Sequence, residues 1–234
     1  MVERYERRIG ESVRRVIDTL PAHVVLVAAV KGRSVAEIQA AIEAGVTHIG
    51  HNYVQEAEAM ADLLQGRVRC HMIGHLQRNK VKKAAPLFDM IETVDSWDLA
   101  KELDKRCALI DKTMRVLVEV NSGKEASKTG VMPEDVESLV RAMSEFEHLA
   151  VQGLMTMGPR FGDPEGARPF FRETRRAYDR LASLDLGHAT MRLLSMGMSN
   201  SYRVAIEEGA NLVRIGTLIF GPREYDVCEP SSET

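Results

Sequence analysis

The stretch Val24-Val25-Leu26-Val27-Ala28-Ala29-Val30-Lys31 sets the expectation for the whole fold. Its first seven residues are all apolar, four of them are valine, and polar side chains do not alternate with them. Such a run is typical of a strand buried on both faces, as in a parallel sheet covered by helices. The sequence therefore predicts a buried parallel strand that ends in a lysine and is followed directly by Gly32.

Seven more strand candidates follow and alternate with helical patterns. They lie at about residues 48–50, 70–73, 88–91, 115–120, 151–155, 193–196 and 212–215. Strands that alternate with helices pair in parallel through right-handed crossovers. Eight of them in about 200 residues favour a closed (β/α)8 TIM-type barrel, an α/β fold, over an open doubly wound sheet.

The chain is expected to form a single domain over residues 1–234. An amphipathic helix over about residues 1–19 precedes the barrel at about 24–221, and a short C-terminal tail follows. The conspicuous loop at 158–169 holds three prolines and three glycines, but it lies between a strand and a helix. No other stretch has the composition of a linker between domains.

The composition is that of a soluble globular protein, with 44% hydrophobic and 28% charged residues among 234. A formal net charge of −3 lacks the basic excess of a nucleic-acid-binding protein. The first twenty residues lack the apolar core of a signal peptide, and no segment reaches transmembrane length. Cys70, Cys107 and Cys228 cannot all pair within one chain, which favours a reducing compartment. We therefore expect a cytoplasmic protein that binds neither nucleic acid nor a membrane.

The chemistry open to Lys31 depends on its protonation state. Its amine is expected to lie next to the apolar interior, where desolvation disfavours the ammonium form. Only the neutral amine attacks a carbonyl to make an imine. On position alone, the more ordinary interpretation is a lysine that ends the strand and carries its charge to solvent. Other residues on the same rim of the barrel have to decide between these interpretations.

The loops after the seventh and eighth strand candidates have the features of a phosphate site. In such barrels the active site lies at the carboxyl ends of the strands, and phosphate often binds at these two loops. The loops read Ser195-Met196-Gly197-Met198-Ser199-Asn200 and Arg214-Ile215-Gly216-Thr217. Glycine allows close backbone approach, and helix amino termini and hydroxyls supply hydrogen-bond donors. An ordinary helix with Ser199 as its N-cap explains one loop alone, whereas both in succession favour an anion.

Four further residues are candidates for the same rim or the barrel interior. If Val213 and Ile215 pack outward, Arg214 faces the interior and needs a carboxylate or a ligand atom as acceptor. His51-Asn52 ends the second strand candidate, and His71 lies in the third, where a core histidine bonded to the backbone is the favoured interpretation. The cysteines and histidines show no metal-ligand spacing, and no Ser-His-Asp motif is present. No metal site and no catalytic residue is therefore assigned.

Seven stretches of the chain together carry a family resemblance. They are residues 28–31 (AAVK), 50–56 (GHNYVQE), 71–80 (HMIGHLQRNK), 121–130 (NSGKEASKTG), 153–156 (GLMT), 194–199 (LSMGMS) and 213–221 (VRIGTLIFG). In this order they closely resemble the YggS/PROSC family of pyridoxal-phosphate-binding (PLP homeostasis) proteins. The resemblance implies a single barrel similar to the amino-terminal domain of alanine racemase.

The resemblance also implies roles for individual residues around pyridoxal 5'-phosphate (PLP). Lys31 is expected to hold PLP as a Schiff base, the internal aldimine. Arg214 is expected to approach the pyridine nitrogen and Asn52 to lie near the ring, and His71 is carried over to the same site. The residues expected to surround the phosphate are Ser195, Gly197, Met198, Ser199, Gly216 and Thr217.

Two departures from the family pattern lie next to these residues. The family usually has Ser-Lys-Thr where this chain has Val30-Lys31-Gly32, and Gly-Glu-Asn where it has Gly50-His51-Asn52. The changes remove two hydroxyls and a carboxylate. Their loss is expected to alter the hydrogen bonding around the aldimine. They leave the lysine and the phosphate loops in place.

The leading hypothesis for function is a cytosolic PLP carrier or homeostasis protein with little or no turnover, whose partners are PLP and PLP-requiring apo-enzymes. An arginine at the ring nitrogen keeps that nitrogen unprotonated, which weakens the ring as an electron sink. A two-base racemase also needs an acid/base group on each face of its substrate. Related racemases gain one from a second domain, which we do not expect here because about a dozen residues follow Gly221. The alternatives are a PLP-dependent enzyme, such as a weak amino-acid racemase, and a Schiff-base aldolase acting on a sugar phosphate.

Overall fold

A computed structural model describes residues 2–125, 128–159 and 162–222 of the chain. Its eight strands form a closed barrel in which each strand pairs in parallel with the next and β8 pairs with β1. The strands are β1 (Val25–Ala29), β2 (His48–His51), β3 (Arg69–Met72), β4 (Met90–Val94), β5 (Met114–Glu119), β6 (Leu149–Met155), β7 (Leu193–Ser195) and β8 (Leu212–Ile215). The predicted (β/α)8 barrel is confirmed, and each predicted strand is present.

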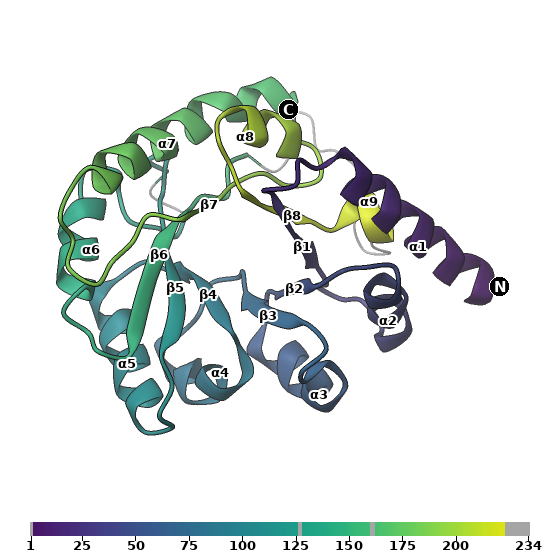
Figure 1. The fold of residues 1–234 in the computed structure, drawn as a ribbon, viewed down its shortest axis with the longest axis horizontal. Coiled ribbons are helices and arrows are strands. Elements are labelled where there is room, and N and C mark those ends of the chain that lie inside the picture. The colour runs from purple at the N-terminus through teal and green to yellow at the C-terminus, as the bar shows by residue number, and fades with distance from the viewer. Residues whose placement is uncertain (1, 126–127, 160–161, 223–234) are drawn as a thin grey trace, which may run out of the picture.

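Helices surround this ring of strands, as Figure 1 shows. The α-helices are α1 (Val2–Thr19), α2 (Val35–Glu43), α3 (Val54–Leu64), α4 (Val81–Leu87), α5 (Trp97–Ala108), α6 (Val136–Met143), α7 (Arg168–Ala182), α8 (Tyr202–Glu207) and α9 (Thr217–Phe220). Two short 3-10 helices, η1 (Arg78–Lys80) and η2 (Pro164–Ala167), precede α4 and α7. The C-terminal tail expected after the barrel lies outside the described residues from 223 onward.

Both faces of β1 are buried, as its unbroken apolar pattern predicts. Leu26 and Ala28 belong to the large hydrophobic cluster between the strands and the helices. Val27 packs inside the barrel with Ile73 and Leu212 in a separate cluster. The alternation of side chains along each strand thus separates an outer core from an inner one.

The extra N-terminal helix is held by polar contacts as well as by its apolar face. Ile9 and Val13 of α1 are fully buried, and α1 lies beside α2 and α9 (Figure 1). The hydroxyl of Tyr5 lies 3.1 Å from Glu37 Oε1 and 3.0 Å from the carbonyl oxygen of Phe220. These contacts connect α1 to α2 and to α9, the helices that follow β1 and β8.

The helix α6 begins at Val136, directly after a turn. Residues 133–135 form a turn, in which the N–H of Asp135 donates to the carbonyl of Met132 at 2.9 Å. The first α-helical bond in this segment runs from Leu139 to Asp135.

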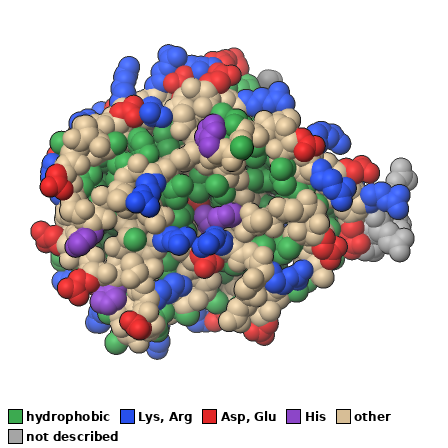
Figure 2. All heavy atoms as spheres, in the orientation of Figure 1, with side chains coloured by type: hydrophobic (Ala, Val, Ile, Leu, Met, Phe, Trp, Pro, Cys, Tyr) green, Lys and Arg blue, Asp and Glu red, His purple; other side chains and the backbone are tan. Residues whose placement is uncertain are grey.

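The surface carries both signs of charge. Figure 2 shows Lys and Arg side chains interspersed with Asp and Glu around the margin of one face, with hydrophobic side chains nearer its middle. Among the described helices, none is long and apolar enough to cross a membrane.

Candidate functional site

The closed parallel barrel brings the carboxyl ends of all eight strands to one rim. Lys31 follows β1, Asn52 follows β2, and the two glycine-containing loops follow β7 and β8. β7 pairs with β8, and β8 pairs with β1, so the two loops lie beside the end of the strand that leads to Lys31. Within this pairing, Val27 of β1 is the register partner of Arg214 of β8. Barrel closure therefore brings together residues that are far apart in the sequence.

Lys31 lies in a turn directly after β1, with its side chain partly buried. The N–H of Arg33 donates to the carbonyl of Val30 at 3.0 Å and closes this turn. The amine Nζ lies 5.1 Å from the ring centroid of Tyr53, which is half exposed in the loop after β2. The lysine therefore reaches the rim of the barrel and lies over an aromatic face.

Gly32 and Glu56 fix the backbone beside Lys31. Gly32 adopts a left-handed conformation with φ 67°, which glycine tolerates better than a residue with a side chain. Its N–H donates to Glu56 Oε1 at 3.1 Å, from the first turn of α3. This contact connects the turn that carries Lys31 to the helix that follows β2.

The loops after β7 and β8 meet through a single oxygen atom. The hydroxyl of Ser199 accepts hydrogen bonds from the backbone N–H groups of Gly216 and Leu218, each at 3.3 Å. The ordinary alternative for this loop, in which Ser199 caps the helix that follows it, does not hold, because the N-cap of α8 is Ser201. Ser199 reaches across to the next loop because the two N–H groups at the start of α9 converge there and need an acceptor.

Glycine is required at Gly197 because the backbone is crowded there. Gly197 has φ 91°, and a side-chain carbon added to it would lie 2.6 Å from Ala205 Cβ and 2.8 Å from Tyr202 Cα. Its carbonyl accepts from the N–H of Arg214 at 3.1 Å, so it also joins β7 to β8. Met198 and Thr217 follow as rim residues, the first partly buried and the second exposed.

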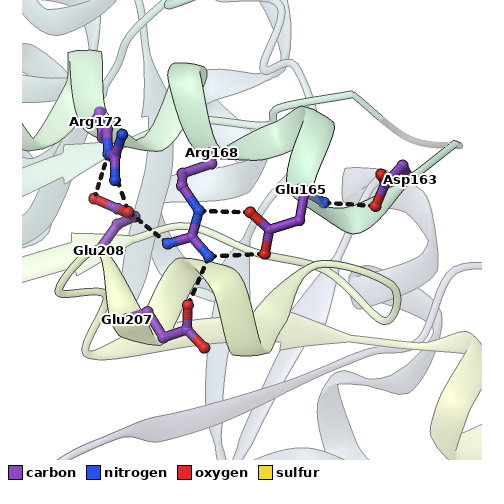
Figure 3. A network of polar contacts seen from close by, with 6 residues as sticks. All are labelled: Asp163, Glu165, Arg168, Arg172, Glu207 and Glu208. Atoms are coloured by element: carbon purple, nitrogen blue, oxygen red, sulfur yellow. Dashed lines mark hydrogen bonds and ion pairs between the residues drawn. The ribbon is translucent and has the colours of Figure 1, made fainter.

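A surface ion network holds the far end of α8 (Figure 3). Arg168 donates to Glu165 at 2.7 and 2.8 Å, to Glu207 at 2.7 Å and to Glu208 at 2.6 Å. Arg172 adds a bond to Glu208 at 3.1 Å. The network connects η2 and the start of α7 to the end of α8, the helix that follows the loop containing Ser199.

Arg214 faces the barrel interior, as the alternation of β8 predicts. Val213 and Ile215 are fully buried in the outer core, and Arg214 is only 3% exposed. Its Nη2 donates to the carbonyl of Thr156 at 2.8 Å, and its Nη1 donates to the Ser195 hydroxyl. Nη1 also lies 3.7 Å from Glu92 Oε2. The sequence left open whether the partner of Arg214 is a carboxylate or a ligand atom, and the structure shows a carboxylate, that of Glu92.

Glu92 connects this arginine to two histidines. Its Oε2 accepts from the Ser195 hydroxyl at 2.6 Å, and its Oε1 lies 2.7 Å from His71 Nδ1. Burial raises the pKa of Glu92, but the hydrogen bond and charge of His71, with Arg214 and Ser195, outweigh it and lower the pKa overall. An ionised carboxylate only accepts, so His71 Nδ1 carries the hydrogen, and its Nε2 lies 2.9 Å from His48 Nδ1.

In this network Ser195 and His71 make contacts that differ from those predicted from the sequence. The Ser195 hydroxyl is completely buried and is used by Glu92 and Arg214, below the loop where the phosphate is expected. His71 bonds to side chains inside the barrel, not to the backbone as the sequence favoured. Sequence reasoning missed Glu92 because the fourth strand was expected to end at Ile91, whereas β4 runs to Val94.

His51 and Asn52 do not share one environment, although the sequence grouped them. His48 faces the interior beside His71, so alternation turns His51 outward, where its ring lies 6.2 Å from that of Phe88. His51 is completely buried, and neither ring nitrogen has a partner among the described residues. Burial lowers its pKa to about 4. Asn52 lies on the rim, where its backbone packs against Gly74.

Comparison with known proteins places the chain among PLP-related barrels. The family model described as alanine racemase, N-terminal domain, matches residues 7–224. A pyridoxal phosphate homeostasis protein of Aquifex aeolicus is 43% identical over 188 residues, which are 77% of this chain and 79% of the relative. One from Vibrio alginolyticus is 35% identical over 210 residues, which are 88% of this chain and 89% of the relative.

Solved structures agree with this placement. PipY of Synechococcus elongatus PCC7942, in a structure with PLP bound, matches at a TM-score of 0.83 and 32% identity, over 91% of this chain and 100% of PipY. An alanine racemase from Corynebacterium glutamicum matches at a TM-score of 0.74 and 19% identity, over 93% of this chain and 62% of the racemase. The racemase likeness is one of fold.

Replacing Glu92 by glutamine tests the buried network. We expect Glu92→Gln to lower the free energy of unfolding by about 3 kcal/mol, because it leaves the buried charge of Arg214 without its carboxylate. Urea denaturation measures this loss. The matched control is Glu58→Gln, which removes an exposed ion pair with Lys83 and is expected to cost less than about 1 kcal/mol. Equal effects of the two substitutions would show that the network is not stabilising.

His51 is expected to make the protein less stable in acid. The unfolded chain binds a proton as the pH falls through 6.5, whereas the folded chain binds it only near 4, so stability is lost as the pH falls between these values. At pH 5 the loss from this residue is about 2 kcal/mol. In His51→Leu, the stability difference between pH 7.5 and pH 5 shrinks by that amount in urea denaturation. His23→Gln, at an exposed position, leaves the difference unchanged; an unchanged difference in His51→Leu as well would contradict the assignment.

Proposed function

We propose a function for this chain on one premise: it belongs to the YggS/PROSC family of pyridoxal phosphate homeostasis proteins. The proposal is that it binds PLP at the rim of its barrel and acts as an intracellular carrier of the cofactor with little or no turnover. The observation that carries the proposal is the convergence of two backbone N–H groups on Ser199, on the same rim as Lys31.

The loops after β7 and β8 fit the phosphate of PLP. The N–H groups of Gly216 and Leu218 already point at one oxygen, which is the arrangement that binds a phosphate oxygen at a helix start. Rotation of the Ser199 side chain leaves both N–H groups free and adds a hydroxyl donor. A Cβ at Gly197 would clash with Ala205 and Tyr202, and one at Gly216 would lie 3.1 Å from the carbonyl oxygen of Ala29, so glycine at these positions lets the two loops take the paths that bring their N–H groups together. The phosphate contacts are therefore assigned to Gly197, Met198, Ser199, Gly216 and Thr217.

Lys31 is the residue proposed to hold the cofactor covalently. PLP, when bound, supplies an aldehyde carbon that a neutral lysine amine can attack. The turn closed by Val30 and Arg33, with the Gly32 contact to Glu56, fixes where the amine projects. Asn52 follows the neighbouring strand, so it is proposed to line the same opening. Ser195 and His71 are proposed to act below the cofactor, by holding Glu92 and thereby Arg214.

Arg214 is proposed to face the pyridine nitrogen and to limit turnover. A guanidinium has five donors and stays protonated, so a nitrogen that faces it serves as an acceptor and remains unprotonated. Its contacts to Thr156, Ser195 and Glu92 prevent it from moving away. The site thus binds the ring without providing the protonated nitrogen that strong carbanion chemistry uses.

The proposal also covers the cellular location and the partners of the protein. Cys70 and Cys107 are both free thiols, as expected of a protein in the reducing cytoplasm. A carrier passes its cargo to other proteins, and apo-enzymes that require PLP are the proposed recipients.

Titration with PLP tests the proposal. The wild-type protein is expected to gain visible absorbance with one equivalent of PLP, and borohydride reduction followed by peptide mapping should place the added mass on Lys31. Lys31→Ala should abolish the reducible attachment while retaining part of the affinity through the phosphate loops. Pyridoxal, which lacks the phosphate, should bind at least about tenfold more weakly, because charge-assisted hydrogen bonds contribute about 1.5–3 kcal/mol each. Lys101→Ala, on the outer helix α5, is the matched control and should behave as wild type.

Exchange of the α-proton separates a carrier from an enzyme. The loaded protein is incubated in deuterated water with each amino acid, and incorporation of deuterium is followed by mass spectrometry. A carrier exchanges no faster than free PLP does. Rapid exchange with inversion at the α-carbon would contradict the carrier role, and failure of the wild-type protein to bind PLP would refute the function altogether.

A further inference from the structure

Arg33 lies two residues after Lys31, at the end of the turn that follows β1. Its N–H closes this turn on the carbonyl of Val30 at 3.0 Å, so the place of its side chain is tied to that of Lys31. The side chain of Arg33 is only 8% exposed, although most arginine side chains extend into solvent. A buried guanidinium requires acceptors, and the acceptors of Arg33 indicate its role.

These acceptors lie at the carboxyl end of α9. Nη1 of Arg33 donates to the carbonyl of Phe220 at 3.4 Å, and Nη2 donates to the carbonyl of Gly221. The guanidinium carbon lies 5.4 Å from the centroid of the Phe220 ring, and Nη1 also donates to Glu37 Oε1 at 3.3 Å. The last carbonyl groups of a helix have no partner within it, so an arginine placed here stabilises the end of α9.

The short helix α9 connects this contact to the loop proposed to bind phosphate. Its four residues span about 6 Å. At its start, the N–H groups of Gly216 and Leu218 converge on the Ser199 hydroxyl. The N–H of Phe220 donates to the carbonyl of Gly216 at 2.9 Å and closes this single turn. Because α9 is one closed turn, a contact that holds its end also holds its start.

The pairing of β1 with β8 stops short of both parts of the proposed site. The last register partners are Ala28 and Ile215, which precede the turn with Lys31 and the start of α9. Within the described chain, every hydrogen bond that joins residues 30–33 to residues 216–221 comes from Arg33. Arg33 therefore links the part of the site that carries the lysine to the part that carries the phosphate donors.

We propose that Arg33 is a positioning residue of the PLP site, which holds the phosphate loop at the distance from Lys31 that one PLP molecule spans. The inference rests on the proposed function, since it needs PLP to bind at Lys31 and at the loops after β7 and β8. The ring of PLP is rigid, so its aldehyde and its phosphate reinforce each other only when their partners are held at the matching distance. In this role Arg33 acts through α9 and does not touch the cofactor.

Three ligands distinguish positioning from direct contact. PLP carries both groups, pyridoxal lacks the phosphate, and pyridoxine 5'-phosphate lacks the aldehyde. Arg33→Ala is expected to raise the Kd for PLP about tenfold, or about 1.4 kcal/mol, because the two contacts no longer reinforce each other. The Kd values for pyridoxal and for pyridoxine 5'-phosphate, which each use one part of the site, should stay within about threefold of wild type. Isothermal titration calorimetry measures all three.

Two further variants control for stability and for charge. Tyr5→Phe removes the other donor to the Phe220 carbonyl, at 3.0 Å, but leaves the turn after β1 untouched. It should lower the urea concentration at which the protein unfolds and leave the Kd for PLP unchanged. Arg33→Lys keeps the charge, but an ammonium group lacks the planar fork that reaches two carbonyls, so PLP should bind about threefold more weakly. If Arg33→Ala fails to fold, Arg33→Lys carries the comparison of the three ligands.

Four results would overturn the proposal. Equal PLP affinity of wild type and Arg33→Ala would show that no positioning is needed, and wild-type affinity in Arg33→Lys would show that charge alone suffices. A loss of pyridoxine 5'-phosphate as large as that of PLP would indicate direct contact with the phosphate. A tenfold loss of PLP in Tyr5→Phe would make the stability of α9 the cause. Failure of the wild-type protein to bind PLP would instead refute the proposed function, whereas these comparisons among PLP-binding variants test Arg33 itself.

Discussion

The buried guanidinium of Arg214 is the constraint on which the interior of this barrel depends. A charge that is 3% exposed requires a counter-charge and acceptors, which Glu92, Ser195 and the carbonyl of Thr156 supply. Glu92 in turn requires donors, and His71 provides one at 2.7 Å. Removing any member leaves another buried group without its partner, so the layer is stable only as a complete set.

This polar layer lies between two parts of the molecule with different tasks. The inner apolar residues Met90, Leu117 and Met155 fill the barrel and contribute stability. The rim carries Lys31 and the loops with Ser199 and Gly216, which are available to a ligand. Arg214 is fixed between them, and in the proposed site it forms a rigid floor, so that little of the binding free energy would be spent on ordering it.

The sequence predicted much of this arrangement, and its failures have physical causes. The alternation of β8 placed Arg214 inside, and the barrel topology placed Lys31 on the rim with the loops after β7 and β8. Glu92 was missed because β4 extends beyond the last apolar pair, and its partner Ser195 lies 103 residues away. His51 was grouped with Asn52 because they are neighbours, although alternation along β2 turns His51 outward into the core, whereas Asn52 lies beyond the strand on the rim.

The sequence by itself determined the eight strands, the parallel barrel, the family and the inward direction of Arg214. These follow from local patterns: the apolar run that ends at Lys31, the period of two along each strand, and short motifs in a fixed order. Only the tertiary structure decided the partners, namely Glu92 for Arg214, the start of α9 for Ser199, and the end of α9 for Arg33. Those choices depend on closure of the barrel, because closure brings side chains from non-adjacent strands into one desolvated space, where each polar atom must find an acceptor or a donor.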